Sequence, residues 1–155
     1  MNVPQLVGGR VVRILLVEDN PNDVELTRRA LNRAKIGNPL SVVEDGQSAL
    51  DLLYRNSMAR DEPGIDLVLL DLGLPKVDGR AVMREIWGDK RLRHIPVIIL
   101  TSSDREDDLT AAYKGGAVAF LRKPVEVERL LTAIGDLHGY QLLITRIEEG
   151  TGSTG

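Results

Sequence analysis

Residues 67–70 read LVLL, and Asp71 follows them directly. This run does not alternate apolar and polar residues, and a short, continuously apolar run fits a strand that is covered on both faces, as in a parallel sheet. Four more short apolar runs flank it in the chain: residues 11–17 (VVRILLV), 40–43 (LSVV), 97–100 (VIIL) and 117–121 (AVAFL). We therefore predict five strands, with residues 67–70 in the middle one by chain order.

Helical patterns separate these apolar runs. Apolar residues recur at helix spacing over residues 22–34, 47–55, 80–87, 105–113 and 126–137. Strands that alternate with helices predict a (βα)5 doubly wound α/β fold, with a parallel five-stranded sheet and helices on both faces. Periodicity does not give the strand order, and 2-1-3-4-5 is one of the two common orders for such sheets.

Composition excludes several classes of protein. The chain has 155 residues, close to the roughly 150 of one domain. It has no cysteine, which excludes disulfides, thiol catalysis and cysteine-ligated zinc. The formal charge of −3 argues against a uniformly basic surface, and the 3% of aromatic residues provides few platforms for stacked bases. We therefore expect no direct nucleic-acid partner.

No apolar stretch approaches the ~18 residues of a membrane span. The first ten residues also lack the basic region and apolar run of a secretory signal. We expect a cytoplasmic protein with no membrane partner.

Polar residues follow the predicted strands, where a parallel sheet binds its ligands. Glu18 and Asp19 follow the first strand, Asp71 the third, Thr101 the fourth and Lys123 the fifth. Carboxylates this close repel one another unless one is protonated or a cation lies between them. Oxygen ligands without nearby cysteine or histidine favour Mg²⁺ over Zn²⁺.

This set of residues also suggests a reaction. An aspartate carboxylate can attack a phosphoryl group and hold it as an acyl phosphate, and Asp71 is the central candidate. Mg²⁺ held by Asp19 would neutralise charge that develops on the phosphoryl oxygens. Lys123 would supply a second positive charge, and Thr101 a hydroxyl donor.

Four motifs resemble those of the receiver domain of two-component response regulators. They are ILLVEDN (residues 14–20), LLDLGLPKVDG (residues 69–79), VIILTSS (residues 97–103) and FLRKP (residues 120–124), within a match over about residues 11–138. The resemblance implies a flavodoxin-like fold with strand order 2-1-3-4-5. It also implies transfer of a phosphoryl group from a sensor histidine kinase onto Asp71, with Mg²⁺ or Mn²⁺ as cofactor.

The resemblance assigns roles around the metal. Asp71 is the phosphoacceptor and Asp19 a direct metal ligand, while Glu18 acts mostly through water. Gly73 would offer its backbone carbonyl to the metal. Gly73 and Ser103 also stand where the family tunes the lifetime of the phosphoryl group.

A second group of roles concerns the phosphoryl group and the response to it. Thr101 and Lys123 would bind the phosphoryl oxygens, and the Lys123–Pro124 peptide bond is expected to be cis. Phe120 stands at the position of the family's switch aromatic, which turns inward as Thr101 closes on the phosphoryl group. Its alternative reading is a strand residue that half covers the sheet.

The ends of the chain suggest how the signal leaves it. We expect an N-terminal extension over residues 1–10, a receiver domain over residues 11–138 and a C-terminal extension over residues 139–155. Too few residues follow the domain for an effector, so the predicted output is protein–protein contact. The extension contains the apolar stretch YQLLITRI (residues 140–147) and ends in small polar residues that we expect to be disordered.

Longer phrases, such as VEDNPNDVELTRRAL and RLRHIPVIILTSS, are similar to single-domain regulators paired with phytochrome-type histidine kinases. Such relatives form homodimers through the fourth helix, the fifth strand and the C-terminal extension. Residues 140–147 are therefore a candidate dimer arm, and the alternative is that they fold back on their own chain. Kinase docking in the family points to the first helix and to the loop after the fifth strand: Pro21, Asn22, Val24, Glu25, Arg28 and Val125.

Several rival functions remain open at this point. A haloacid-dehalogenase-type phosphatase would need a second aspartate where this chain has Gly73. A nucleotide or flavin binder on the same fold would need a phosphate loop, and none follows the first strand. The chain could instead be a phosphate sink, a phosphorelay intermediate or a scaffold-like pseudo-receiver. Any catalysis would be self-phosphorylation and autodephosphorylation, not that of a conventional enzyme.

Overall fold

The computed structural model describes residues 6–7, 10–11, 13–33, 39–58, 64–72, 79–101 and 119–135. The strands of these residues are β1 (Leu6–Val7), β2 (Arg10–Val11), β3 (Ile14–Val17), β4 (Leu40–Val43), β5 (Leu67–Asp71), β6 (Val97–Thr101) and β7 (Ala119–Arg122). The helices are α1 (Pro21–Arg33), α2 (Gly46–Met58), α3 (Gly79–Gly88) and α5 (Val127–Gly135).

The main sheet is parallel and five-stranded, in the order β4-β3-β5-β6-β7. Counted along the chain within this sheet, the order is 2-1-3-4-5, which confirms the predicted flavodoxin-like topology. The strands β3, β5 and β6 are buried along their whole length, whereas the edge strands β4 and β7 are only partly buried. Continuous apolar runs therefore mark the strands with two covered faces.

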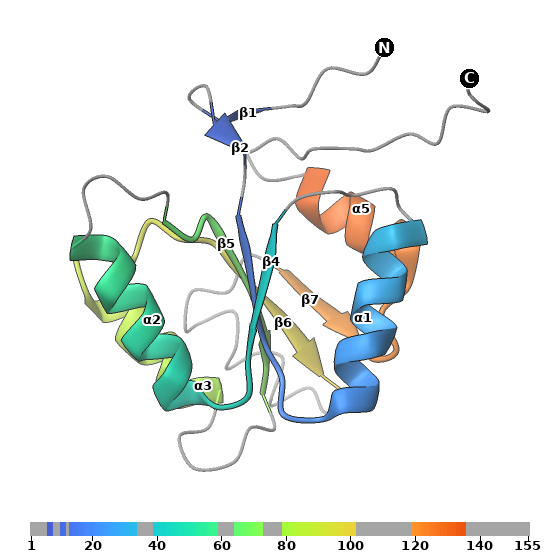
Figure 1. Ribbon diagram of the computed structural model, residues 1–155, viewed down its shortest axis with the longest axis horizontal. Helices are drawn as coiled ribbons and strands as arrows, with labels where there is room; N and C mark the ends of the chain where they lie inside the picture. The colour runs from blue at the N-terminus through green and yellow to red at the C-terminus, as the bar shows by residue number, and fades with distance from the viewer. Residues whose placement is uncertain are drawn as a thin grey trace.

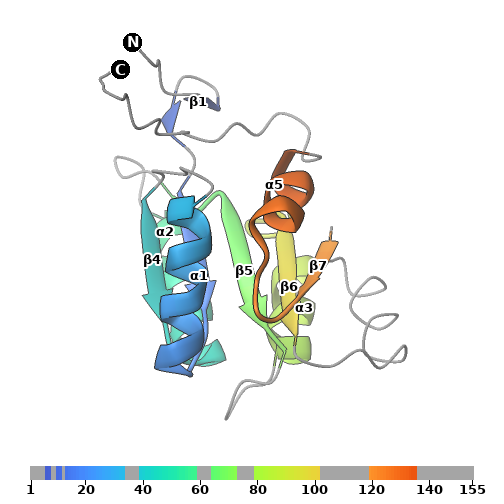
Figure 2. The ribbon, with the colours of Figure 1, turned by 90° about the vertical axis from the view of Figure 1, so that its right-hand side faces the viewer.

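Helices cover both faces of the sheet (Figure 1, Figure 2). Helices α2 and α3 pack on one face, and α1 and α5 pack on the other. Successive strand residues alternate between the two cores: Leu69 packs with α1 and α5, whereas Leu70 packs with α2 and α3. The apolar residues of β5 are therefore divided between two helix layers.

The first predicted strand differs from the observed one. The apolar run over residues 11–17 contributes only Ile14–Val17 to the main sheet, because Val11 instead pairs antiparallel with Leu6 in the separate β1–β2 sheet. The main sheet starts at Ile14, which pairs with both Leu40 and Leu67.

Side chains at the helix starts explain where α1 and α2 begin. Asn20 Oδ1 accepts hydrogen bonds from the backbone N–H groups of Asn22 and Asp23, and Asp45 Oδ1 accepts one from Ser48. These bonds satisfy donors that lack partners in the first turn of a helix. The observed helices agree with the predicted ones to within about three residues, a normal uncertainty at helix ends.

Some predictions lie outside the described residues. They are the fourth helix over residues 105–113 and the extension over residues 139–155. Among the helices that the structure does describe, none has the length and apolar character needed to cross a membrane.

Candidate functional site

The parallel register brings the predicted site residues to one end of the sheet. Asp71 and Thr101 are the last residues of β5 and β6, and Glu18 and Lys123 directly follow β3 and β7. Backbone hydrogen bonds continue past the strands: Leu72 N–H donates to Leu100 O at 3.3 Å, and Lys123 N–H donates to Thr101 O at 2.8 Å. The positions of Asp71 and Lys123 are thus tied to β6, which lies between their strands.

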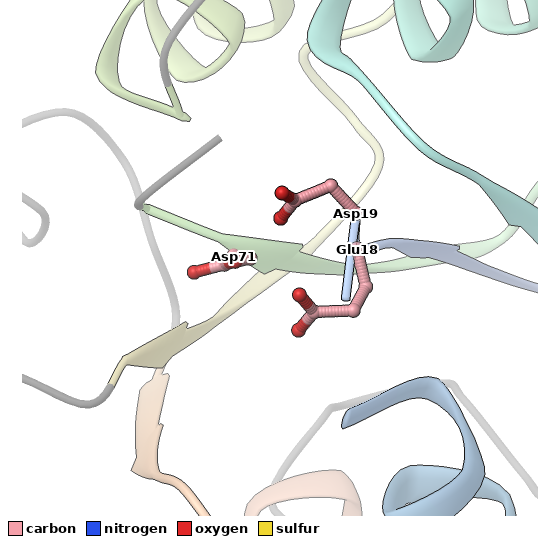
Figure 3. Close-up of side chains that lie close together, drawn as sticks. All are labelled: Glu18, Asp19 and Asp71. Carbon is pink, nitrogen blue, oxygen red and sulfur yellow. The ribbon is translucent and has the colours of Figure 1, made fainter. Parts of the chain in front are cut away.

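Three carboxylates converge at this end of the sheet, those of Glu18, Asp19 and Asp71 (Figure 3). One ligand oxygen from each lies within 4.8 Å of the others. Glu18 and Asp71 are buried, whereas Asp19 is exposed. Burial raises the pKa of the Glu18 carboxyl to about 7, and the charge of Asp71 adds to this shift while Lys123 opposes it.

Lys123 supplies the positive charge opposite these carboxylates. Its Nζ lies 2.5 Å from Glu18 Oε1, 2.9 Å from Asp23 Oδ2 and 3.2 Å from Asp71 Oδ2. Burial disfavours the ammonium, but hydrogen bonds to Glu18 and Asp23 and the charge of Asp71 outweigh it and raise the pKa of Lys123. The side chain is therefore a fixed cation beside the candidate acceptor.

The donor set fits a hard divalent cation. Three carboxylates offer oxygen ligands, which Mg²⁺ and Mn²⁺ prefer. The buried Oε1 of Glu18 faces the Lys123 ammonium as an ion pair. Lys123 pairs with Glu18 and Asp71 of these three carboxylates, and a metal cation would further reduce the repulsion among them.

The remaining predicted residues lie as follows. Thr101 is buried at the end of β6, near the backbone of Lys123. Phe120 is partly buried and packs against the core on the α2–α3 face, pairing in register with Ile99. The Lys123–Pro124 peptide bond is cis. Gly73 and Ser103 lie outside the described residues.

The sequence argument missed two neighbours of the site. Asp23, in the first turn of α1, binds Lys123, and its only signal in the sequence was an acidic residue near a predicted helix start. Gly79, at the start of α3, lies against the backbone of Asp71 and Leu72. In the sequence it stood only as the last residue of the motif LLDLGLPKVDG (residues 69–79), because a contact between two separate elements leaves no local signal.

Comparison with known families agrees with this geometry. A family model described as "Response regulator receiver domain" matches residues 14–135, most of the chain. The resemblance to this family predicted a parallel sheet with the order 2-1-3-4-5. The structure has this sheet, with an acidic cluster at the carboxyl ends of its strands. The chain belongs to the response regulator receiver domain family.

Individual relatives narrow the resemblance. The bacteriophytochrome response regulator AtBRR is 45% identical, with a TM-score of 0.76 over 88% of this chain and 99% of that one. Response regulator Rcp1 of Synechocystis sp. is 36% identical over 83% of this chain and 88% of its own length. A solved structure of Rcp1 is an Mn²⁺-bound form, with 37% identity and a TM-score of 0.65 over 78% of this chain and 87% of that one.

Similarity extends beyond phytochrome systems. The probable methanogenesis regulatory protein FilR2 of Methanothrix harundinacea is 41% identical over 83% of each chain. The resemblance to phytochrome response regulators is therefore confirmed, but other regulators share a comparable degree of identity.

Proposed function

We propose that this protein is a phosphoacceptor response regulator: Asp71 takes a phosphoryl group from a phosphohistidine of a sensor kinase. The observation that carries the proposal is the position of Asp71, whose carboxylate lies among two other carboxylates and 3.2 Å from the Lys123 ammonium. A nucleophile, a fixed cation and a candidate metal site then occupy one end of the sheet. We place the output in protein–protein contacts.

The proposed step is a displacement at phosphorus. An Asp71 carboxylate oxygen attacks the phosphorus, the P–N bond to the imidazole breaks, and the electron pair leaves with the nitrogen. Lys123 pairs with the phosphoryl oxygens, and the Thr101 hydroxyl donates a hydrogen bond to them once the group is attached. Phe120, packed beside Ile99, is the proposed switch residue that repacks when Thr101 moves.

We propose that the cofactor is Mg²⁺ or Mn²⁺. Asp19 and Asp71 would bind it directly, Glu18 would bind it through water, and the backbone carbonyl of Gly73 would be a further ligand. A divalent cation there supplies positive charge for the phosphoryl oxygens. The Mn²⁺-bound form of Rcp1 supports this assignment. Gly73 and Ser103 keep their proposed role in setting the phosphoryl lifetime.

The first experiment measures intact mass after incubation with acetyl phosphate and Mg²⁺. We expect one phosphoryl adduct on the wild-type chain. EDTA should abolish it, and so should Asp71→Asn, because an amide is not a phosphoryl acceptor. A wild-type chain that binds Mg²⁺ but forms no adduct, even with a panel of phosphorylated kinases, would point to the scaffold-like pseudo-receiver.

We further propose that the kinase is of the phytochrome type. The support is the similarity to AtBRR and Rcp1, while the identity to FilR2 makes a comparison between kinases necessary. Phosphotransfer from a purified bacteriophytochrome kinase should be at least about tenfold faster than from unrelated histidine kinases, a difference of about 1.4 kcal/mol in activation free energy. Equal rates across the panel would contradict the pairing.

Homodimerisation is a separate proposal. The proposed interface consists of the predicted fourth helix over residues 105–113, strand β7, which is the fifth strand of the main sheet, and the extension over residues 139–155. The apolar stretch over residues 140–147 supports it. Deletion from residue 139 onward should give a monomer by sedimentation, whereas the intact chain should sediment as a dimer. An unchanged dimer mass after deletion would show that the extension is not the link.

A further inference from the structure

The ammonium of Lys123 is shared by three carboxylates, one more than the metal and acceptor residues account for. The additional partner is Asp23, whose Oδ2 accepts a hydrogen bond from Lys123 Nζ at 2.9 Å. An ammonium has three N–H donors, so Glu18, Asp23 and Asp71 together match its capacity. The three partners come from different segments: Glu18 follows β3, Asp23 lies in α1, and Asp71 ends β5.

The distances from Lys123 Nζ indicate which of the three carboxylates hold the ammonium in place. Glu18 and Asp23 are its two nearer partners, at 2.5 and 2.9 Å, and Asp71 is the most distant at 3.2 Å. A lysine side chain has four flexible carbons, and two anchors greatly restrict where its ammonium lies. Asp23 is 29% exposed, so it holds the lysine from the more solvent-accessible side.

We propose that Asp23 is a positioning residue for phosphoryl transfer: with Glu18, it holds the Lys123 ammonium so that its remaining N–H group faces the acceptor Asp71. This inference rests on the proposed function. Asp23 acts through Lys123 and does not itself touch the phosphoryl group. Without Asp23, the ammonium loses its anchor on α1 and contacts a phosphoryl group on Asp71 for less of the time.

Asp23 also has an ordinary structural role, since an acidic residue in the first turn favours a helix by about 0.3–1 kcal/mol. A double-mutant cycle separates the two roles, because coupling to Lys123 is measured directly. The four chains are the wild type, Asp23→Ala, Lys123→Ala and the double variant. Glu128→Ala is the matched control, since Glu128 is an exposed acid in the first turn of another helix, α5, whereas the ion pairs of Lys123 are with Glu18, Asp23 and Asp71.

The measured quantity is the initial rate of phosphorylation by acetyl phosphate with Mg²⁺, followed by intact mass. We expect Asp23→Ala to slow the reaction about tenfold, the scale of losing a charged hydrogen bond that orients a reacting group. The same substitution should have no further effect in the Lys123→Ala background, and Glu128→Ala should leave the rate unchanged. Equal slowing in both backgrounds, or none in either, would overturn the proposal.

A second measurement needs neither metal nor phosphoryl donor. In metal-free protein labelled with ¹⁵N-lysine, the ammonium of Lys123 should exchange its protons slowly, and Lys123→Ala identifies its signal. Asp23→Ala should broaden or remove this signal, while Glu128→Ala should not. An unchanged signal would overturn the proposal. This test still decides if Lys123→Ala takes up no phosphoryl group and the rates in that background cannot be compared. Absence of any adduct on the wild type would instead contradict the proposed function.

Discussion

Gly79 shows how a single residue controls the surroundings of the acceptor. A Cβ atom at this position would lie 2.7 Å from the backbone O of Asp71 and 2.7 Å from the Cα of Leu72. Both contacts are with backbone, which cannot move aside as a flexible side chain can. The Gly79 N–H also donates to Leu72 O at 3.3 Å, so the start of α3 lies directly against the end of β5.

We expect Gly79→Ala to lower the free energy of unfolding by about 1–3 kcal/mol, the usual cost of overpacking. Gly88→Ala is the control, because nothing lies within 4 Å of a Cβ at that position, at the end of the same helix. It should be neutral or stabilise by about 0.4–1 kcal/mol through the unfolded chain. Urea unfolding of the two variants measures the difference, and equal effects would refute the close-approach argument.

At the scale of elements, a polar network joins α2 to α3 on the surface. The Tyr54 hydroxyl donates a hydrogen bond of 2.6 Å to Glu85 Oε2, and the Arg91 guanidinium lies 5.0 Å from the centre of the Tyr54 ring. Asp89 pairs in turn with Arg91 at 3.0 Å. The hydrogen bond to Glu85 raises the pKa of Tyr54 to about 12, because the phenolate would face a carboxylate.

This pKa shift predicts a dependence of stability on alkaline pH. The folded state holds the Tyr54 proton more tightly than the unfolded state, whose tyrosines titrate near pH 10. The contribution of Tyr54 is therefore complete below about pH 10 and is lost as the pH rises toward about 12. In urea titrations, Tyr54→Phe should cost about 0.5–1.5 kcal/mol at pH 8 and less at pH 11.

Glu85→Gln is the control for this prediction. The amide oxygen still accepts the Tyr54 hydrogen bond, but it carries no charge to oppose the phenolate. We expect this variant to keep most of the stability at pH 8 and to lose less than the wild type between pH 8 and pH 11. An equal loss in both chains would show that Glu85 does not hold the Tyr54 proton.

On the scale of the whole molecule, the buried carboxylates of the acidic site oppose folding, and nearby cations offset their repulsion. Glu18 is 1% exposed, and its charge is compensated within a site formed by β3, α1, β5 and the residue after β7. Removing one partner of a buried ion pair leaves an uncompensated charge, which costs more than the pair contributes. The stability of the chain should therefore depend on which cations the site holds.

We expect Lys123→Ala to lower the free energy of unfolding in EDTA by roughly 1–3 kcal/mol, less than for a fully buried pair because Glu18 can take up a proton. Added Mg²⁺ should stabilise both chains as ligand binding does, and it should recover part of the loss in the variant. Lys90→Ala, at an exposed lysine, is the control and should change little in either buffer. A loss that is the same with and without Mg²⁺ would contradict a shared site.

Local patterns were sufficient to predict much of this protein. The apolar runs over residues 67–70 and 97–100 predicted buried strands, because covering both faces of a strand requires continuous apolar sequence. The motifs around Glu18, Asp71, Thr101 and Lys123 placed those residues at strand ends, and parallel strands bring such ends together. The strand order came from the resemblance to the receiver family, because periodicity carries no information on which strands pair.

Tertiary structure alone decided the contacts between distant segments. It showed that Val11 pairs with Leu6 in the β1–β2 sheet, whereas the main sheet begins at Ile14. One apolar run is thus divided between two sheets. It also brought Asp23 to Lys123, 100 residues further along the chain, and Gly79 to the backbone of Asp71. Residue type and spacing describe a segment and its own periodicity, whereas these contacts depend on how separate segments pack in space.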